Sequence, residues 1–132
     1  MLAPALDALR LSLHVLAATV WVGGQIVMLG LLPTARQLGG DAPGALARAF
    51  ARLSWPAFAV LVLTGFWNVA QVHPKTHDWQ VVLGVKLGFV VLAGLGAFLH
   101  GRSTTRTSLA VWGSIAGVAS IVALVLGVLL AG

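Results

Sequence analysis

Two ionisable side chains, His14 and Lys86, fall inside apolar stretches that are long enough to cross a bilayer. A charged or titratable group inside a membrane is costly, so each such residue is a candidate functional residue. The imidazole nitrogens of His14 are suited to copper, zinc or haem iron. Lys86 could instead extend its ammonium group toward the membrane surface. The chemistry open to these residues depends on the helices that carry them.

Both residues belong to patterns that place side chains on one helix face. His14 shares such a face with a set of polar and large residues, because their spacings of four, seven, four and three return to the same side of a helix. These residues are Arg10, His14, Trp21, Gln25 and Met28. In a later stretch Trp79, Lys86, Ala93 and His100 recur every seven residues. We expect both faces to point into a helical bundle.

Depth in the membrane predicts which candidate residues could meet. His14 and Lys86 lie at similar positions in helices expected to be parallel, about 10 Å below the outer surface at roughly 1.5 Å per residue. His73 and His77 follow the second stretch, which carries Asn68 near its end. This placement predicts an outer-side metal site made by His14, His73 and His77.

Structural alternatives to this site stay open. The fourth histidine, His100, lies about 21 Å further along its helix than Lys86, so we expect it near the cytoplasmic side and outside the site. His73 and His77 could be ordinary solvated loop residues. His14 could serve helix association by hydrogen bonding to Gln25, Asn68 or a backbone carbonyl.

The composition indicates an integral membrane protein. Of 132 residues, 59% are apolar and 8% are charged, with a mean hydropathy of +1.00. A helix crosses the hydrocarbon core with roughly 20 apolar residues, and the chain contains four such stretches. We expect spans at residues 8–32, 51–72, 80–100 and 109–131, the first ended by Pro33 and the turn at 39–41. The short connections predict an all-α, up-down-up-down bundle forming a single domain over residues 1–132.

The charge distribution predicts the orientation of this bundle. The first and third connections are rich in arginine, whereas the opposite side balances its basic residues with acidic ones. The positive-inside rule therefore places both termini outside the cytoplasm of a multi-pass protein. The net charge of +5 is distributed by membrane side rather than gathered into a patch with aromatic residues, so we expect no nucleic-acid partner.

Several kinds of chemistry lack the residues that they need. The chain has no cysteine, which excludes disulfides, thiolate metal sites and thiol nucleophiles. Its acidic residues are three aspartates, with no glutamate and no evident nucleophile beside a base, so we assign no catalytic residue. The first stretch could alternatively be a signal peptide, but Asp7 and the absence of a small-residue cleavage site favour a membrane helix.

Three segments resemble the CopD family of bacterial copper-resistance membrane proteins. The run from Leu13 to Gly24, LHVLAATVWVGG, is similar to that family's opening helix. RAFARL at 48–53 followed by VLTGFWN at 62–68 is similar to its second helix, and LGVKL to its third. The resemblance covers roughly residues 12–100. It implies copper uptake or tolerance in the bacterial plasma membrane, with His14, Trp21 and Lys86 as functional positions. A periplasmic copper-binding partner and a homo-oligomer are further expectations, although full CopD proteins are larger than this chain.

The chain also resembles, more distantly, the HemJ family of four-helix membrane proteins. The shared features are a histidine early in the first helix and the Trp79, Lys86 and His100 pattern in the third. This resemblance implies protoporphyrinogen oxidation or electron transfer with haem b. His14 would then be an axial haem ligand, with Arg10 or Lys86 pairing with a propionate. A third alternative is a structural membrane subunit without chemistry of its own.

Overall fold

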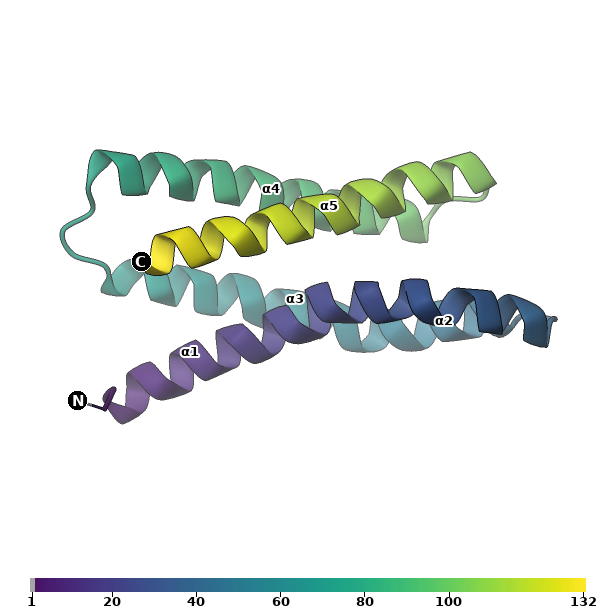
Figure 1. Cartoon of the computed structure of the whole chain (residues 1–132), viewed down its shortest axis with the longest axis horizontal. Helices are drawn as coiled ribbons and strands as arrows, with labels where there is room; N and C mark the ends of the chain where they lie inside the picture. Colours follow the sequence, from purple (N-terminus) through teal and green to yellow (C-terminus); the bar gives the residue numbers. More distant parts are fainter. Residues whose placement is uncertain (1) are drawn as a thin grey trace. The chain divides into compact units, whose positions relative to one another are not determined.

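The computed structural model describes residues 2–132, and in that part of the chain every regular element is a helix (Figure 1). This confirms the predicted all-α fold class. The elements are α1 (Ala5–Ala18), the π-helical segment η1 (Thr19–Gly23), α2 (Gly24–Leu38), α3 (Ala42–Gln71), α4 (His77–Gly101) and α5 (Arg106–Ala131).

Four of the resulting helices are long and apolar enough to cross a membrane, as predicted. The first combines α1, η1 and α2 into one continuous helix of 34 residues, and α3, α4 and α5 supply the others with 30, 25 and 26 residues. The connections at residues 72–76 and 102–105 lie where the sequence predicts them. The hydroxyls of Thr76 and Thr105 cap the helices that follow them, accepting from the backbone N–H of Trp79 and Ser108.

The prediction that Pro33 ends the first helix is wrong. Pro33 lies inside α2, which continues to Leu38. A proline removes one backbone hydrogen bond, and a membrane helix can continue past it when local adjustments satisfy the freed carbonyl. The helix ends instead at Gly39 and Gly40, whose φ angles of 76° and 57° are easy for glycine alone.

The second long helix begins earlier than predicted. It starts at Ala42 rather than near residue 51, with Pro43 in its first turn, where the missing N–H of proline has no consequence. The helix therefore includes Arg48 and Arg52. Pro56 also lies inside this helix.

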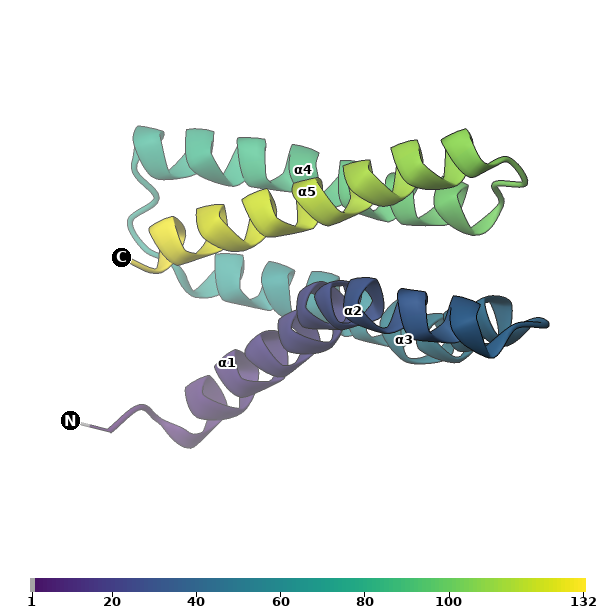
Figure 2. The same ribbon diagram turned by 45° about the vertical axis from the view of Figure 1, so that its right-hand side comes forward.

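The described chain divides into two compact units, residues 2–72 and 73–132. In the first, the α1–α2 helix runs back along α3; in the second, α4 and α5 form an antiparallel pair (Figures 1 and 2). Each unit is described by itself below. The single four-helix domain and the side on which the termini lie therefore stay predictions.

Aromatic side chains form the centre of the first unit. The ring of Trp21 lies 5.4 Å from that of Trp55 and 4.5 Å from that of Phe58, measured between centroids. Tilted and edge-on pairs of this kind stabilise a core beyond their buried area. Ala17 and Ala35 are buried above and below this cluster along the same helix.

Small residues form the centre of the second unit. Ala93 and Gly96 of α4 are buried, as are Ala116 and Ala119 of α5. A Cβ atom added at Gly96 would lie 3.0 Å from the backbone nitrogen of Ala116. The two helices are thus in close backbone contact, which is how membrane helices commonly associate.

Candidate functional site

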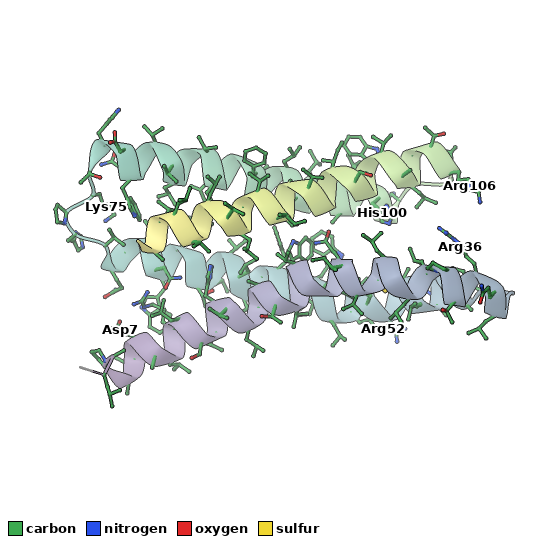
Figure 3. The ribbon with its side chains drawn as sticks, viewed as in Figure 1. Asp7, Arg36, Arg52, Lys75, His100 and Arg106 are labelled. Carbon is green, nitrogen blue, oxygen red and sulfur yellow. The ribbon has the colours of Figure 1, made fainter. Side chains whose placement is uncertain are left out.

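A line of polar side chains joins α1 to α3 in the first unit. Arg10 is buried, with 8% of its surface exposed. Its guanidinium donates to Asp7 Oδ1 at 2.9 Å and to the amide oxygen of Asn68. Arg10 Nε is buried and has no hydrogen-bond partner within residues 2–132. Figure 3 places Asp7 at the end of this unit opposite to Arg36 and Arg52.

His14 lies one helical turn further along α1 and bonds to Thr64 of α3. The distance from His14 Nδ1 to Thr64 Oγ1 is 2.8 Å. The Thr64 hydroxyl is also 2.7 Å from the Val60 carbonyl oxygen, to which it donates its single proton. Thr64 therefore accepts from His14 Nδ1, which in the neutral imidazole leaves the lone pair on Nε2. That tautomer presents Nε2 as the nitrogen able to coordinate a metal.

Gly65 gives the imidazole of His14 its space on α3. A Cβ atom at Gly65 would lie 3.6 Å from His14 Cε1, which is ordinary van der Waals contact, so a larger side chain would crowd the ring. The ring is thus held by a hydrogen bond on one side and by helix packing beside it. Fixing a ligand in this way is the usual role of residues that surround a metal site.

The matching spacing of the polar residues explains their pairing. Arg10 and His14 are four residues apart on α1, and Thr64 and Asn68 are four apart on α3. Because the helices are antiparallel, Arg10 meets Asn68 while His14 meets Thr64. The sequence analysis identified Asn68 but missed Thr64, although the four-residue spacing was available as a signal.

The part of the same face from Trp21 to Met28 has a packing role. Trp21 is buried in the aromatic cluster. Gln25 Nε2 donates to the Trp21 carbonyl at 3.0 Å, and Met28 is half-buried. None of these contacts brings Gln25 or Met28 to the His14 ring.

Lys86 lies against α5 in the second unit. A Cβ atom at Gly127 would lie 2.9 Å from Lys86 Nζ, so the ammonium occupies the space that glycine leaves. Trp79, one heptad before Lys86, donates its indole N–H to the Leu130 carbonyl at 3.3 Å. The last carbonyls of a helix lack backbone partners and carry partial negative charge. Trp79 thus stabilises the C-terminal end of α5, while Lys86 packs beside Gly127.

His100 lies at the other end of this unit, near Arg106 (Figure 3). Its Nδ1 is 2.8 Å from the Leu109 carbonyl oxygen. A carbonyl only accepts, so Nδ1 carries the proton here as well. The ring also packs against Gly113, where a Cβ atom would lie 3.0 Å from Nδ1. These contacts join the two ends of the α4–α5 connection.

His73 and His77 stand at the start of the second unit and are both exposed. Because His14 belongs to the first unit, the cluster of three histidines stays a prediction. Within residues 2–132, no group of three or more histidine and acidic side chains is placed to hold a metal ion.

Comparison with known proteins adds no family assignment. No family model, curated protein or solved structure matches this chain.

Proposed function

We propose that this four-span membrane protein handles copper, with His14 as a copper ligand. The observation that carries the proposal is the Thr64 hydrogen bond to His14, which directs the lone pair onto Nε2. Imidazole nitrogen is a common ligand for copper in proteins. The resemblance of the first three helices to the CopD family gives copper uptake or tolerance as the process served.

The charges around His14 favour this use. The guanidinium of Arg10, one turn away, pairs with Asp7, so a bound cation would not face an uncompensated positive charge. The polar oxygens of Asp7 and Asn68 lie along the same line. Together these groups give a cation a polar environment between two otherwise apolar helices.

A haem protein is the second candidate, and the burial of Arg10 favours it. An arginine one turn from an axial histidine could bind a haem propionate, and Arg10 Nε lacks a partner in the described chain. Lys86 and His100 are the further residues that the HemJ resemblance assigns to this function. A structural subunit without a cofactor is the third.

One experiment separates the three candidates. The protein is purified in detergent, its reduced-minus-oxidised optical spectrum is recorded, and copper and iron are quantified in the same sample. Copper without a Soret band supports copper handling, whereas a Soret band with stoichiometric iron supports the haem protein. The absence of both metals would contradict both and favour the structural subunit.

Variants of His14 show whether the bound metal uses this site. His14→Ala should abolish metal binding. Thr64→Val should weaken the affinity for the metal by about tenfold, because the His14 ring loses the hydrogen bond that orients it. Thr64→Ser keeps a hydroxyl and should retain binding. For copper the control is His100→Ala, because His100 is a histidine of the other unit. For haem, to which the HemJ resemblance also assigns His100, the control is His77→Ala. Copper content that stays the same in His14→Ala, at a normal protein level, would contradict the proposal.

A further inference from the structure

The π-helical segment Thr19–Gly23 divides the first long helix into two functional halves. The outer half, α1, carries Arg10 and His14, whereas the inner half, α2, lacks both. Single π turns within α-helices are uncommon and are frequently found at functional sites. Hydropathy does not reveal such a segment, and the sequence analysis missed it.

Two side-chain hydrogen bonds flank the segment. The Thr19 hydroxyl donates to the Val15 carbonyl at 2.8 Å, and Gln25 Nε2 donates to the Trp21 carbonyl at 3.0 Å. Neither bond is part of the regular backbone pattern of an α-helix. Both supply a donor to a carbonyl close to the place where the backbone pattern changes.

Both α2 and the π segment pack against α3, the segment through the buried Trp21, and space within the segment is found at Gly23. Gly24 lies directly against the Phe50 ring, and no side chain larger than hydrogen would fit there. A Cβ atom at Gly23 would meet nothing within 4 Å. In both views the axis of α1 is inclined to that of α2 (Figures 1 and 2). The helix thus changes direction at the π segment, as expected for a π-bulge.

Changing this segment to α-helix would turn the outer half about its axis. Five residues in a π turn advance roughly a quarter turn less around the helix than five residues in an α-helix. With α2 fixed against Phe50, that rotation falls on α1. The hydrogen bond from His14 to Thr64 would then be lost, and so would the bond from Arg10 to Asn68. The backbone would keep its hydrogen bonds in the new pattern.

We propose that Thr19–Gly23 is a swivel joint that sets which face of α1 lies against α3. The π form holds His14 on Thr64, and the α form turns His14 away. Copper bound to His14 favours the π form, a step that rests on the proposed function. The segment is thus a two-state element of the kind that ligands shift by binding one state better.

Spin labels can follow this rotation directly, because the chain contains no native cysteine. One pair of labels, at Leu9 and Leu63, reports on α1 against α3; these side chains are 51% and 69% exposed. The reference pair, at Leu29 and Leu53, reports on α2 against α3 with 71% and 68% exposed. Distances are measured by double electron–electron resonance in lipid.

The test variant, Thr19→Val with Gln25→Leu, removes both flanking bonds. We expect the Leu9–Leu63 distance to change by about 5 Å or more, as a quarter turn of a helix with labels near its surface requires, while the reference pair stays the same. The control variant, Thr34→Val with Gln37→Leu, makes the same changes at exposed positions of α2 and should shift neither distance. An unchanged Leu9–Leu63 distance in the test variant overturns the proposal, as does an equal change in both pairs.

Two further measurements keep the proposal falsifiable if that variant does not fold. Deletion of Val20 leaves four residues, which in an α-helix turn through about the same angle as five residues in a π turn, so this variant should leave the Leu9–Leu63 distance nearly unchanged. A large selective change in this variant overturns the proposed geometry. In the labelled chain without further substitutions, Cu(I) should narrow the distribution of Leu9–Leu63 distances. A distribution that stays unchanged while copper binds overturns the swivel but leaves copper handling intact. A selective shift in the test variant, together with no copper bound by the chain that keeps Thr19 and Gln25, overturns copper handling but leaves the swivel intact.

Discussion

The two units of this chain hold their helices together by different means. In residues 2–72 the contact between α1 and α3 uses hydrogen bonds and aromatic rings, with Arg10 and His14 bonded to side chains of the facing helix. In residues 73–132, α4 and α5 approach so closely at Gly96 that a methyl group would crowd the opposite backbone. Polar bonds and close packing are the two main sources of helix association in lipid.

This difference shows where chemistry can be placed. A contact made of glycine and alanine leaves no room for a ligand, whereas the α1–α3 contact contains a fixed imidazole and a buried guanidinium. In the second unit Trp79 and His100 lie toward opposite ends of α4 and donate to backbone carbonyls of α5, whereas Lys86 occupies space beside Gly127. We therefore assign the candidate site to the first unit.

The largest effect is expected at the close contact of the second unit. Gly96→Ile should lower the free energy of unfolding by more than about 2 kcal/mol, because the added atoms meet the Ala116 backbone. The measurement is unfolding in mixed detergent micelles followed by tryptophan fluorescence. Gly84→Ile on the same helix is the control, since a Cβ there meets nothing within 4 Å. Equal losses in the two variants would show that close packing is not what holds α4 to α5.

The polar contact of the first unit should be next in size. Arg10→Met removes the bonds to Asp7 and Asn68 and should cost about 1–2 kcal/mol in the same assay, in line with polar contacts between membrane helices. The control is Arg48→Met, whose partner Asp41 is 72% exposed at its side chain; a surface pair of this kind contributes about 0.5 kcal/mol or less. If Arg10 proved as replaceable as Arg48, the first unit would not depend on polar bonding.

Thr64 should show a smaller effect on stability. Thr64→Val keeps the shape of the side chain but removes the bond to His14, so we expect a loss of about 0.5–1 kcal/mol in unfolding. Thr64→Ser, which keeps a hydroxyl, should recover most of it. A serine variant as unstable as the valine variant would point to the methyl group rather than to the hydrogen bond.

The smallest effect is expected at the end of α5. Trp79→Phe removes the indole N–H that Leu130 accepts and should cost about 0.5 kcal/mol, because helix ends in a membrane can bond to interfacial water instead. Trp112→Phe, which removes another indole N–H in the same unit, is the matched comparison and should be close to neutral. A loss at Trp79 as large as that at Gly96 would mean that capping, not packing, dominates this unit.

Much of the fold follows from the sequence. Apolar stretches long enough for a bilayer predict the four helices, and the turn at Gly39 and Gly40 gives the end of the first one correctly. Pro33 misleads because a proline costs one hydrogen bond, which a long apolar helix can lose without ending. The early start of α3 was missed because residues 42–50 are less apolar than the span that follows.

The candidate site could be predicted only in part. A helix-face pattern finds Arg10 and His14 on α1, because the spacing of residues along one helix determines on which face their side chains lie. It does not determine which residue of another helix lies opposite, so Thr64 was missed. The π segment depends on donors and rings brought together by folding, and no run of residues in Thr19–Gly23 indicates it.

The helix lengths also bear on the bilayer that suits this protein. At about 1.5 Å per residue, the first helix extends roughly 50 Å, against a hydrocarbon core of about 30 Å. The helices of the second unit, at 25 and 26 residues, exceed that core much less. The first unit must therefore tilt or extend its arginine-bearing end into the headgroup layer, and a thicker bilayer should reduce that mismatch. Membrane thickness is thus a variable to which the unit carrying His14 should respond more strongly than its neighbour.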